Sequence, residues 1–344
     1  MVIMNLESIA RLSGVSRSTV SRVINNSPRV SEEARRKVLD VIRQTNFQPN
    51  IAARSLASGN TRILGLVIPT AVTNLFIDPY FPLLIQGITA ACNARDYSMM
   101  LWLADVEYER RMIRQILYSS LIDGVLLASM PADDPLLEAL LEAERPFVIQ
   151  GRDPYHDNVA FIDVDNLESS RHATLHLARL GRRRIAHITG PLNTAVGQDR
   201  RQGYESALGQ SGLSYNPALV AGGDFTYEGG YQAMLHLLPH NPDSVFVASD
   251  TMAQGALHAI LENGRTVPQD IALVGFDDMP FAAHMIPPLT TVRQPVQRMG
   301  SVAAETLIEL IEHPSTKPRG IRLPTELVIR ASCGFSLRPG AAAN

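Results

Sequence analysis

Residues 6–25, LESIARLSGVSRSTVSRVIN, decide the fold at the beginning of the chain. Asn5 is positioned to cap a first helix. Gly14 is positioned to end it, because glycine adopts the left-handed conformation of a tight turn at little cost. Ser16 then caps a second helix whose outer face carries small, hydroxylated and basic side chains. The apolar stripe between the two helices is predicted to comprise Leu6, Ile9, Ala10, Leu12, Val15, Val20, Val23 and Ile24.

A third helix is predicted to complete this unit. Ser31 can cap it, and the acidic residues Glu32 and Glu33 suit the positive end of the helix dipole. Its buried residues are predicted to be Val38, Val41 and Ile42, with Phe47 closing the core. Two helices joined by a short turn, the second lying in the major groove, form a helix-turn-helix. The alternative is a generic three-helix packing module.

The second helix carries the side chains that we expect to contact DNA. Arg17 and Arg22 suit bidentate hydrogen bonds to guanine O6 and N7, and the Ser18 hydroxyl can bond either donor or acceptor edges. Phosphate contacts, which fix position rather than sequence, are assigned to Ser16, Thr19, Ser21 and Asn25.

The distribution of charge supports a nucleic-acid partner at one end of the chain. Residues 1–60 hold nine Arg or Lys against four acidic residues, a net charge of +5, whereas the whole chain carries −3 and its remainder therefore −8. A basic head on an acidic body suits an anionic polymer bound at the head alone. A solvated charged face, the alternative, would not confine the excess to the first sixty residues.

Residues 50–57, NIAARSLA, are predicted to act as a connector. Asn50 can cap a helix there, but two turns are too short to be stable alone in water. An apolar side chain on a basic connector suits insertion between base steps of the minor groove, and Leu56 is the candidate. The alternative is an ordinary interdomain linker. The DNA-binding residues assigned to this segment are Asn50, Ala53, Arg54 and Leu56.

Strands and helices alternate from Arg62 onward. The apolar runs RILGLVIP, YSMMLWLA, DGVLLAS and PFVIQ suit buried parallel strands, and VAFIDV, RIAHITG, SVFVAS and IALVGF form a second set. The helices between them are predicted around 81–95, 107–119, 135–144, 167–180, 198–210, 229–238 and 251–262. Two such sets predict two doubly wound lobes, with ligands bound in a cleft beyond the carboxyl ends of the strands. The tail segments RQPVQRMG and LPTELVIRA should cross between the lobes.

The blocks GVSRSTVSRVIN, VSEEARRKVLDVI and NFQPNIAARSLASGNTRILGLVIP resemble the start of the LacI/GalR family of transcriptional regulators. HLARLGRRRIAHITG, RRQGYESAL, VFVASDTMAQGALHAI, IALVGFDD and PPLTTVRQP extend the resemblance over nearly the whole chain. It implies a helix-turn-helix headpiece on a type I periplasmic-binding-protein-like body, and a homodimer on pseudo-palindromic operator DNA with the connectors folding together in the minor groove. Residues 1–49 are then the headpiece, 50–60 the hinge and 61–338 the body. The N-lobe is expected at about 61–160 plus 292–320, and the C-lobe at about 161–291 plus 321–338.

Polar and aromatic residues near strand ends are candidates for binding a small effector. The resemblance implies that Arg200, three residues before a glycine, grips the ligand and that Phe225 covers it. An arginine with carboxylates and aromatic walls suits a sugar, although a cap or a surface ion pair is the alternative for each residue alone. The candidates are Asp78, Tyr80, Phe81, Gln150, Arg152, Arg200, Phe225, Ser249, Asp250 and Asp277.

Other classes of protein have little support. Nucleotide-binding glycine motifs and the G-x-S-x-G motif are missing, and His172 and His176 share a helix face without a third ligand, so we predict no enzyme, cofactor or metal. The N-terminus lacks an export signal, and no apolar run reaches the roughly 18 residues of a membrane span, which predicts a cytoplasmic protein. Cys92 and Cys333 are expected to be free thiols. The chain ends without a heptad helix, so we expect a dimer.

A sugar-induced repressor is the first choice of function, and the alternatives are co-repression by a purine-like or phosphorylated ligand, a solute-binding receptor, or a sugar-acting enzyme.

Overall fold

The computed structural model describes residues 4–24, 27–47, 60–68, 75, 77–103, 121–128, 135–153, 155–156 and 158–335. The chain divides into two compact units, Met1–Thr61 and Arg62–Asn344. The helices of the first unit are α1 (Leu6–Ser13), α2 (Arg17–Ile24) and α3 (Glu32–Thr45). Each begins where the capping pattern predicts, because Asn5, Ser16 and Ser31 accept hydrogen bonds from backbone amides of the first turn. Gly14 ends α1 in the left-handed conformation, with φ of 66°.

One residue of the predicted apolar stripe does not join the headpiece core. The buried apolar residues are Ile9, Ala10, Val20, Val23, Val38 and Phe47, whereas Leu12 is 56% exposed. The buried face of α1 continues from Ile9 to Ser13, whose hydroxyl donates to the Ile9 carbonyl at 2.6 Å. Residues three or four apart lie on the same face of a helix, so Ser13 shares the buried face with Ile9 and Leu12 does not. The Ser13 hydroxyl can be buried there because its hydrogen bond is formed within the helix.

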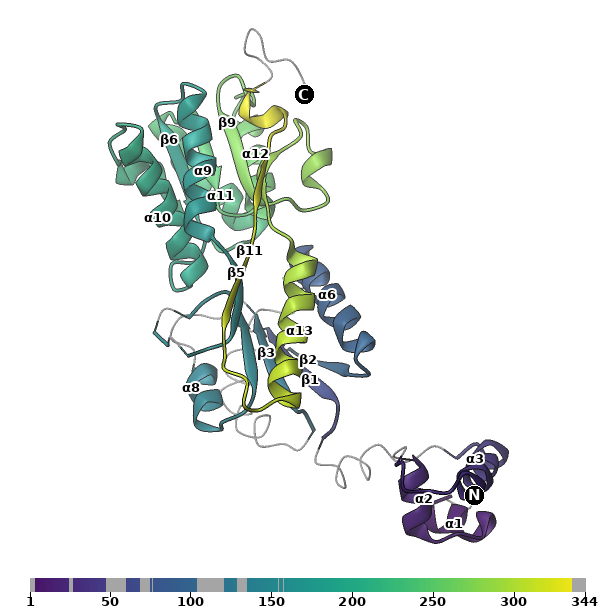
Figure 1. The fold of residues 1–344 in the computed structure, drawn as a ribbon. Helices are drawn as coiled ribbons and strands as arrows, with labels where there is room; N and C mark the ends of the chain where they lie inside the picture. The colour runs from purple at the N-terminus through teal and green to yellow at the C-terminus, as the bar shows by residue number, and fades with distance from the viewer. Residues whose placement is uncertain are drawn as a thin grey trace. The chain divides into compact units, whose positions relative to one another are not determined.

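The second unit has two lobes, each built on a sheet with six strands among the described residues. In the N-lobe sheet, of order β11-β5-β4-β3-β1-β2, every pair is parallel. Its strands are β1 (Ile63–Ile68), β2 (Ser98–Leu103), β3 (Gly124–Ala128), β4 (Phe147–Gln150), β5 (Phe161–Val164) and β11 (Gly320–Leu323), and its helices are α6 (Tyr80–Ala94), α8 (Pro135–Glu142) and α13 (Val296–Glu312). Helices α6 and α13 cover one face of this sheet and α8 lies on the other (Figure 1). Alternate residues of β1 face opposite layers, because Leu64 and Leu66 pack with α6 and α13 whereas Val67 packs with α8.

The C-lobe sheet has the order β12-β10-β9-β8-β6-β7, and only its edge strand β12 is antiparallel to its neighbour. Its strands are β6 (Ile185–Thr189), β7 (Val220–Gly222), β8 (Ser244–Val247), β9 (Ala272–Asp277), β10 (Thr290–Arg293) and β12 (Glu326–Val328). Its helices are α9 (Asn166–Arg179), α10 (Ala195–Gln210), α11 (Tyr227–Leu237) and α12 (Asp250–Glu262), with short 3-10 turns η1 (Pro217–Leu219), η2 (Leu238–His240), η3 (Ala282–His284) and η4 (Ala331–Cys333). Phe246 faces the core with α9 and α10, and Val245 faces α11 and α12.

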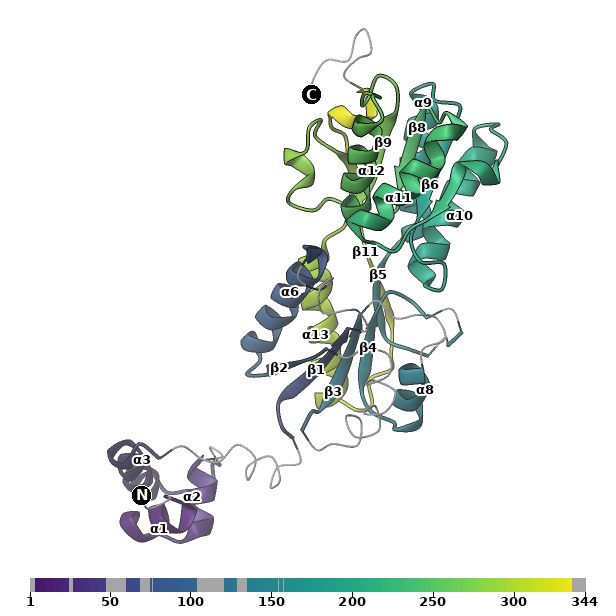
Figure 2. The same cartoon turned by 180° about the vertical axis from the view of Figure 1, so that it is seen from behind.

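Three described segments cross between the lobes: β5 to α9, β10 to α13, and β11 to β12 (Figure 2). The last two fall in the predicted segments RQPVQRMG and LPTELVIRA. The assignment of VAFIDV to the C-lobe is wrong, because β5 pairs with β4 and β11 in the N-lobe sheet, and β11 extends that lobe past residue 320. An apolar run suits a buried strand of either sheet, so periodicity alone did not reveal the partner. The long helix α13 was not predicted, and the helix expected at 107–119 lies outside the described residues.

Candidate functional site

The outer face of α2 presents the side chains predicted to read base edges. Arg17, Ser18 and Arg22 are exposed, and neither arginine forms an ion pair with any described residue. The Ser18 hydroxyl lies 2.8 Å from the Ser16 hydroxyl, which also caps the helix through the Thr19 amide. A base edge that bonds the Ser18 hydroxyl would therefore have to replace this local hydrogen bond.

The remaining DNA-contact predictions divide between partly buried and undescribed positions. Thr19 and Ser21 are partly buried, and the Thr19 hydroxyl lies 2.9 Å from the Ser16 hydroxyl. Asn25, Asn50, Ala53, Arg54 and Leu56 lie outside the described residues. The roles of all these residues stay predictions.

A cavity of about 640 Å³ lies in the body between residues of the two lobes. It is lined by the carboxyl ends of strands and the helix starts that follow them, the position that doubly wound sheets offer to ligands. The structure brings together at this cavity Asp78, Tyr80, Phe81, Gln150, Arg152, Arg200, Phe225, Ser249 and Asp277, nine of the ten residues that the sequence singled out.

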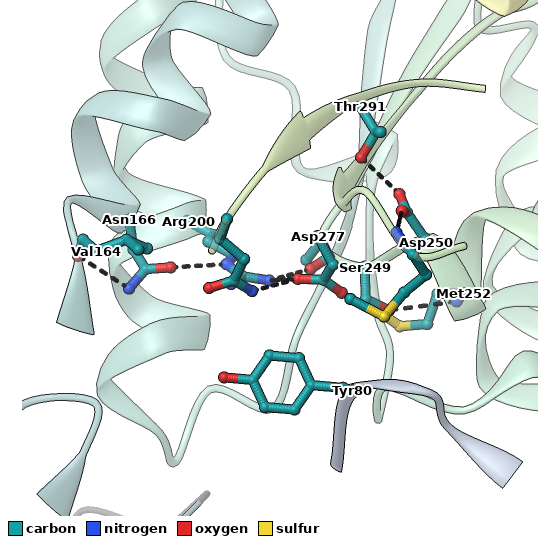
Figure 3. Close-up of polar contacts among 12 residues, drawn as sticks. Tyr80, Val164, Asn166, Arg200, Ser249, Asp250, Met252, Asp277 and Thr291 are labelled. Carbon is teal, nitrogen blue, oxygen red and sulfur yellow. Dashed lines mark hydrogen bonds and ion pairs between the residues drawn. The ribbon is translucent and has the colours of Figure 1, made fainter. Parts of the chain in front are cut away.

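Asp250 is the exception, because it does not line the cavity. Its carboxylate is fully buried and accepts hydrogen bonds from the Thr291 hydroxyl at 2.6 Å and the Met279 amide at 2.8 Å (Figure 3). Asp250 thus ties α12 to the segments after β9 and within β10, and it is removed from the candidate effector residues. Its neighbour Ser249 does line the cavity, and the Ser249 hydroxyl caps α12 by accepting from the Met252 amide at 3.2 Å.

Arg200 lines the cavity and is held in place by contacts with several neighbouring residues. Its guanidinium stacks on the Phe276 ring, 3.6 Å from the centroid, and Nε donates to Asn166 Oδ1 at 3.0 Å. Nη1 donates to the Ala248 carbonyl and lies 3.6 Å from Asp277 Oδ1 (Figure 3). Nη2 has no hydrogen bond to a described residue, so this end of the fork is free to bind a ligand oxygen.

Tyr80 faces Arg200 and Asp277 from the N-lobe (Figure 3). Its hydroxyl accepts a hydrogen bond from Gln150 Nε2 at 2.6 Å, which leaves the phenolic proton available for donation. The cavity thus combines donors at Tyr80 and Arg200 with carboxylate acceptors. This arrangement suits a ligand with several hydroxyl groups, each of which donates and accepts.

Burial controls the charge of the carboxyl groups around this ligand space. It raises the pKa of Asp277 to about 7, although the neighbouring Arg200 opposes that rise. Burial also raises the pKa of Asp163 to about 6, and it raises the pKa of Asp78. Burial lowers the pKa of Arg200, and the neighbouring Asp277 opposes that decrease. The Asp277 carboxylate would cost more to bury without Arg200 beside it than with this charged partner.

Phe225 closes one side of the cavity in a strained conformation. Its φ is 66°, in the left-handed region that bulky residues avoid. A Cβ on Gly190 would lie 2.4 Å from the ring, so only glycine fits beneath Phe225. Asp277, with φ of 119°, is a second strained residue at the cavity. The fold therefore holds Phe225 and Asp277 in backbone conformations that these residues do not prefer by themselves.

Several lining residues follow no recognised sequence pattern and were therefore not predicted. Asn166 is the first residue of α9 and bonds both Arg200 and Asp163, and Gln294 Nε2 donates to Asp277 Oδ1 at 2.6 Å. Asp163 and Gln294 lie next to segments that cross between the lobes. A polar residue beside an apolar strand is the sequence signal that could have identified them. Further lining residues that were missed include Asn193, Thr194, Asp224, Thr226, Tyr227, Glu228 and Thr251.

The described residues contain no group of three potential metal ligands, and none of their helices has the length and apolar character to cross a bilayer. His172 contacts Glu168, whereas His176 lies 3.3 Å from the Cys333 thiol, so the two histidines have separate partners. Cys92 and Cys333 are both free and buried.

Comparison with known proteins gives matches along the chain. Residues 5–50 match the family model described as bacterial regulatory proteins, lacI family, and residues 174–333 match the periplasmic binding protein-like domain. The HTH-type transcriptional regulator CelR of Thermobifida fusca is 40% identical over 95% of this chain and 97% of its own length. A solved complex of the transcriptional regulator CelR with cellobiose has a TM-score of 0.76 at 38% identity, and covers 96% of this chain and 99% of the other. The lac repressor dimer bound to operator and the anti-inducer ONPF has a TM-score of 0.83 at 27% identity, with the same coverage. These matches confirm the predicted fold class.

Proposed function

Because the chain belongs to the lacI family of bacterial regulatory proteins, we propose that it is a transcriptional repressor that binds operator DNA as a homodimer and responds to a neutral sugar. The headpiece would read the operator through Arg17, Ser18 and Arg22, and the body would bind the sugar. Such a repressor acts in the cytoplasm as a binding protein and not as an enzyme.

The observation that carries the sugar assignment is the polar composition of the cavity. Tyr80 and Arg200 offer donors, and Asp78, Asp163 and Asp277 offer acceptors, around space bounded by Phe225. Six carboxylate side chains line the cavity against two arginines, and both arginines contact a carboxylate already: Arg152 bonds Asp199, and Arg200 lies beside Asp277. An anionic ligand would meet net negative charge, so a phosphorylated effector is the weaker candidate.

The coupling would work through two arrangements of the body. A sugar that binds one arrangement more tightly shifts the balance toward it, by no more than the difference between its two affinities. We propose that the sugar-bound arrangement disfavours folding of the segment 50–60 on DNA, which releases the operator. The relative bound to cellobiose makes that sugar the first one to test.

The test combines operator selection with a ligand panel. Operator sequences are selected from random duplexes with the full chain, and release is measured by fluorescence anisotropy with cellobiose, glucose, ribose, glucose 6-phosphate and guanine. A neutral sugar should weaken operator binding, and Tyr80→Phe should reduce the response through loss of one hydroxyl. Arg201→Ala is the matched control, because Arg201 lies on α10 beside Arg200 but pairs with Glu205 outside the cavity. Response to the phosphate or the purine alone, or no selected sequence, would refute the proposal.

A further inference from the structure

Arg152 and Asp199 join the two lobes at the wall of the cavity. Arg152 follows β4 of the N-lobe, and Asp199 lies on α10 of the C-lobe, directly before Arg200. Nε of Arg152 donates to Oδ2 at 3.0 Å and Nη2 to Oδ1 at 2.5 Å, a bidentate geometry. The side chains are 29% and 11% exposed. No other ion pair between described residues of the body links one lobe to the other.

This geometry gives Arg152 a different role from the ligand contact that the sequence analysis assigned to it. Two of its donors are already directed at Asp199, and a bidentate pair fixes the relative orientation of the groups that it connects. The groups here belong to separate lobes, which are also connected by the crossing segments and by a hydrogen bond between Asp78 and Thr251. The pair therefore restricts the motion that those segments would permit.

We propose that Arg152 is a positioning residue which, through Asp199, clamps the two lobes in the arrangement that encloses the effector. The clamp acts on α10, the helix that carries Arg200, and so it holds Arg200 opposite Tyr80 of the N-lobe. Loss of either partner frees the lobes to separate at this edge. The consequence for sugar affinity rests on the proposed function, whereas the effect on lobe separation does not.

The lobe distance can be measured by pulsed electron paramagnetic resonance without any ligand. Spin labels are attached at Glu142→Cys on α8 and Ser206→Cys on α10, two exposed positions on helices that lie on the same side of the body in Figures 1 and 2. The native Cys92 and Cys333 are buried, and an excess of unlabelled chain restricts the measured distances to one protomer.

Arg152→Ala and Asp199→Asn should each give a longer and broader distance distribution than the unmodified pair. The exchanged variant Arg152→Asp/Asp199→Arg should restore the shorter distance, and Asp199→Asn, which keeps the side-chain shape, guards against loss of folding. Arg201→Ala is the matched control, because it removes an ion pair of α10 that stays within the C-lobe. Distributions that stay unchanged in both single variants, or that the exchange does not restore, would overturn the clamp.

A second measurement uses cellobiose binding by titration calorimetry. The single variants should weaken binding by up to about tenfold, the size expected for one charged hydrogen-bonded pair, and the exchange should recover most of it. Equal affinities in all variants would contradict the link from clamp to effector. An unmodified protein that binds no sugar would count against the proposed function, while the distance measurements would still decide the clamp.

Discussion

Removal of Arg200 should destabilise the body by about 3–5 kcal/mol, because it leaves a buried carboxylate without its charged partner. Arg200 and Asp277 are only 4% and 6% exposed, and the Arg200 Nη1 to Asp277 Oδ1 distance is 3.6 Å. Arg200→Ala also deprives Asn166 Oδ1 of its donor, a loss of about 1–3 kcal/mol by itself when the acceptor stays buried. The contacts share one network, so their losses overlap and do not add.

The loss should be larger at high pH than at low pH. Burial raises the pKa of Asp277 from its ordinary 3.8 to about 7, so ionisation of Asp277 lowers stability as the pH rises between these values. Arg200 opposes this shift, and its removal should raise the pKa of Asp277 further. At pH 5 the Asp277 carboxyl is mostly protonated and needs no charged partner. At pH 8, without Arg200, folding must either bury an unpaired carboxylate or keep a proton on Asp277, and both cost free energy. Arg200→Ala should therefore lose less stability at pH 5.

Urea unfolding of the full chain at the two pH values measures both effects. Far-UV circular dichroism and the fluorescence of Trp102, the single tryptophan, which lies in β2, report on the body. The double variant Arg200→Ala/Asp277→Asn should recover about 1–3 kcal/mol relative to the sum of the single losses, because the amide carries no charge. Strictly additive losses, or a loss of equal size at pH 5 and pH 8, would refute the reasoning.

Three further predictions concern separate parts of the chain. Arg22→Ala should cost about 1–3 kcal/mol in operator binding and relax preference at one base pair, and an unchanged preference in a binding selection would remove Arg22 from base reading. Leu56→Ala should weaken operator binding while sparing random DNA, and anisotropy titrations showing equal losses on both would contradict the wedge. Burial lowers the pKa of His187 to about 4, so the unfolded chain takes up this proton first and the body should lose up to roughly 3 kcal/mol as the pH falls from 6.5 to 4. Thermal melts of His187→Phe should lack that part of the acid destabilisation, and an identical pH profile would exclude His187 as its source.

Features encoded within one or two turns of the chain could be predicted from the sequence. The caps at Asn5, Ser16 and Ser31 and the turn at Gly14 depend on neighbouring backbone groups, and each lies where the pattern indicated. Nine candidate effector residues line one cavity because the carboxyl ends of parallel strands meet at one sheet edge. Leu12 shows the limit of a local pattern, since the hydroxyl of Ser13 completes the buried face instead.

Contacts between distant segments could be decided only by the tertiary structure. β5 pairs in the N-lobe sheet, Asp250 bonds Thr291 instead of facing the cavity, and Arg152 pairs with Asp199 of the other lobe. Composition and periodicity specify which side chains are buried or polar, but not which of several equivalent partners each one meets. That choice depends on how the two sheets pack and on the positions of the segments that cross between them, because a hydrogen bond requires its two atoms to lie within about 3 Å. The sequence thus determined the kinds of residue that form the site, and the packed lobes determined which of them act together.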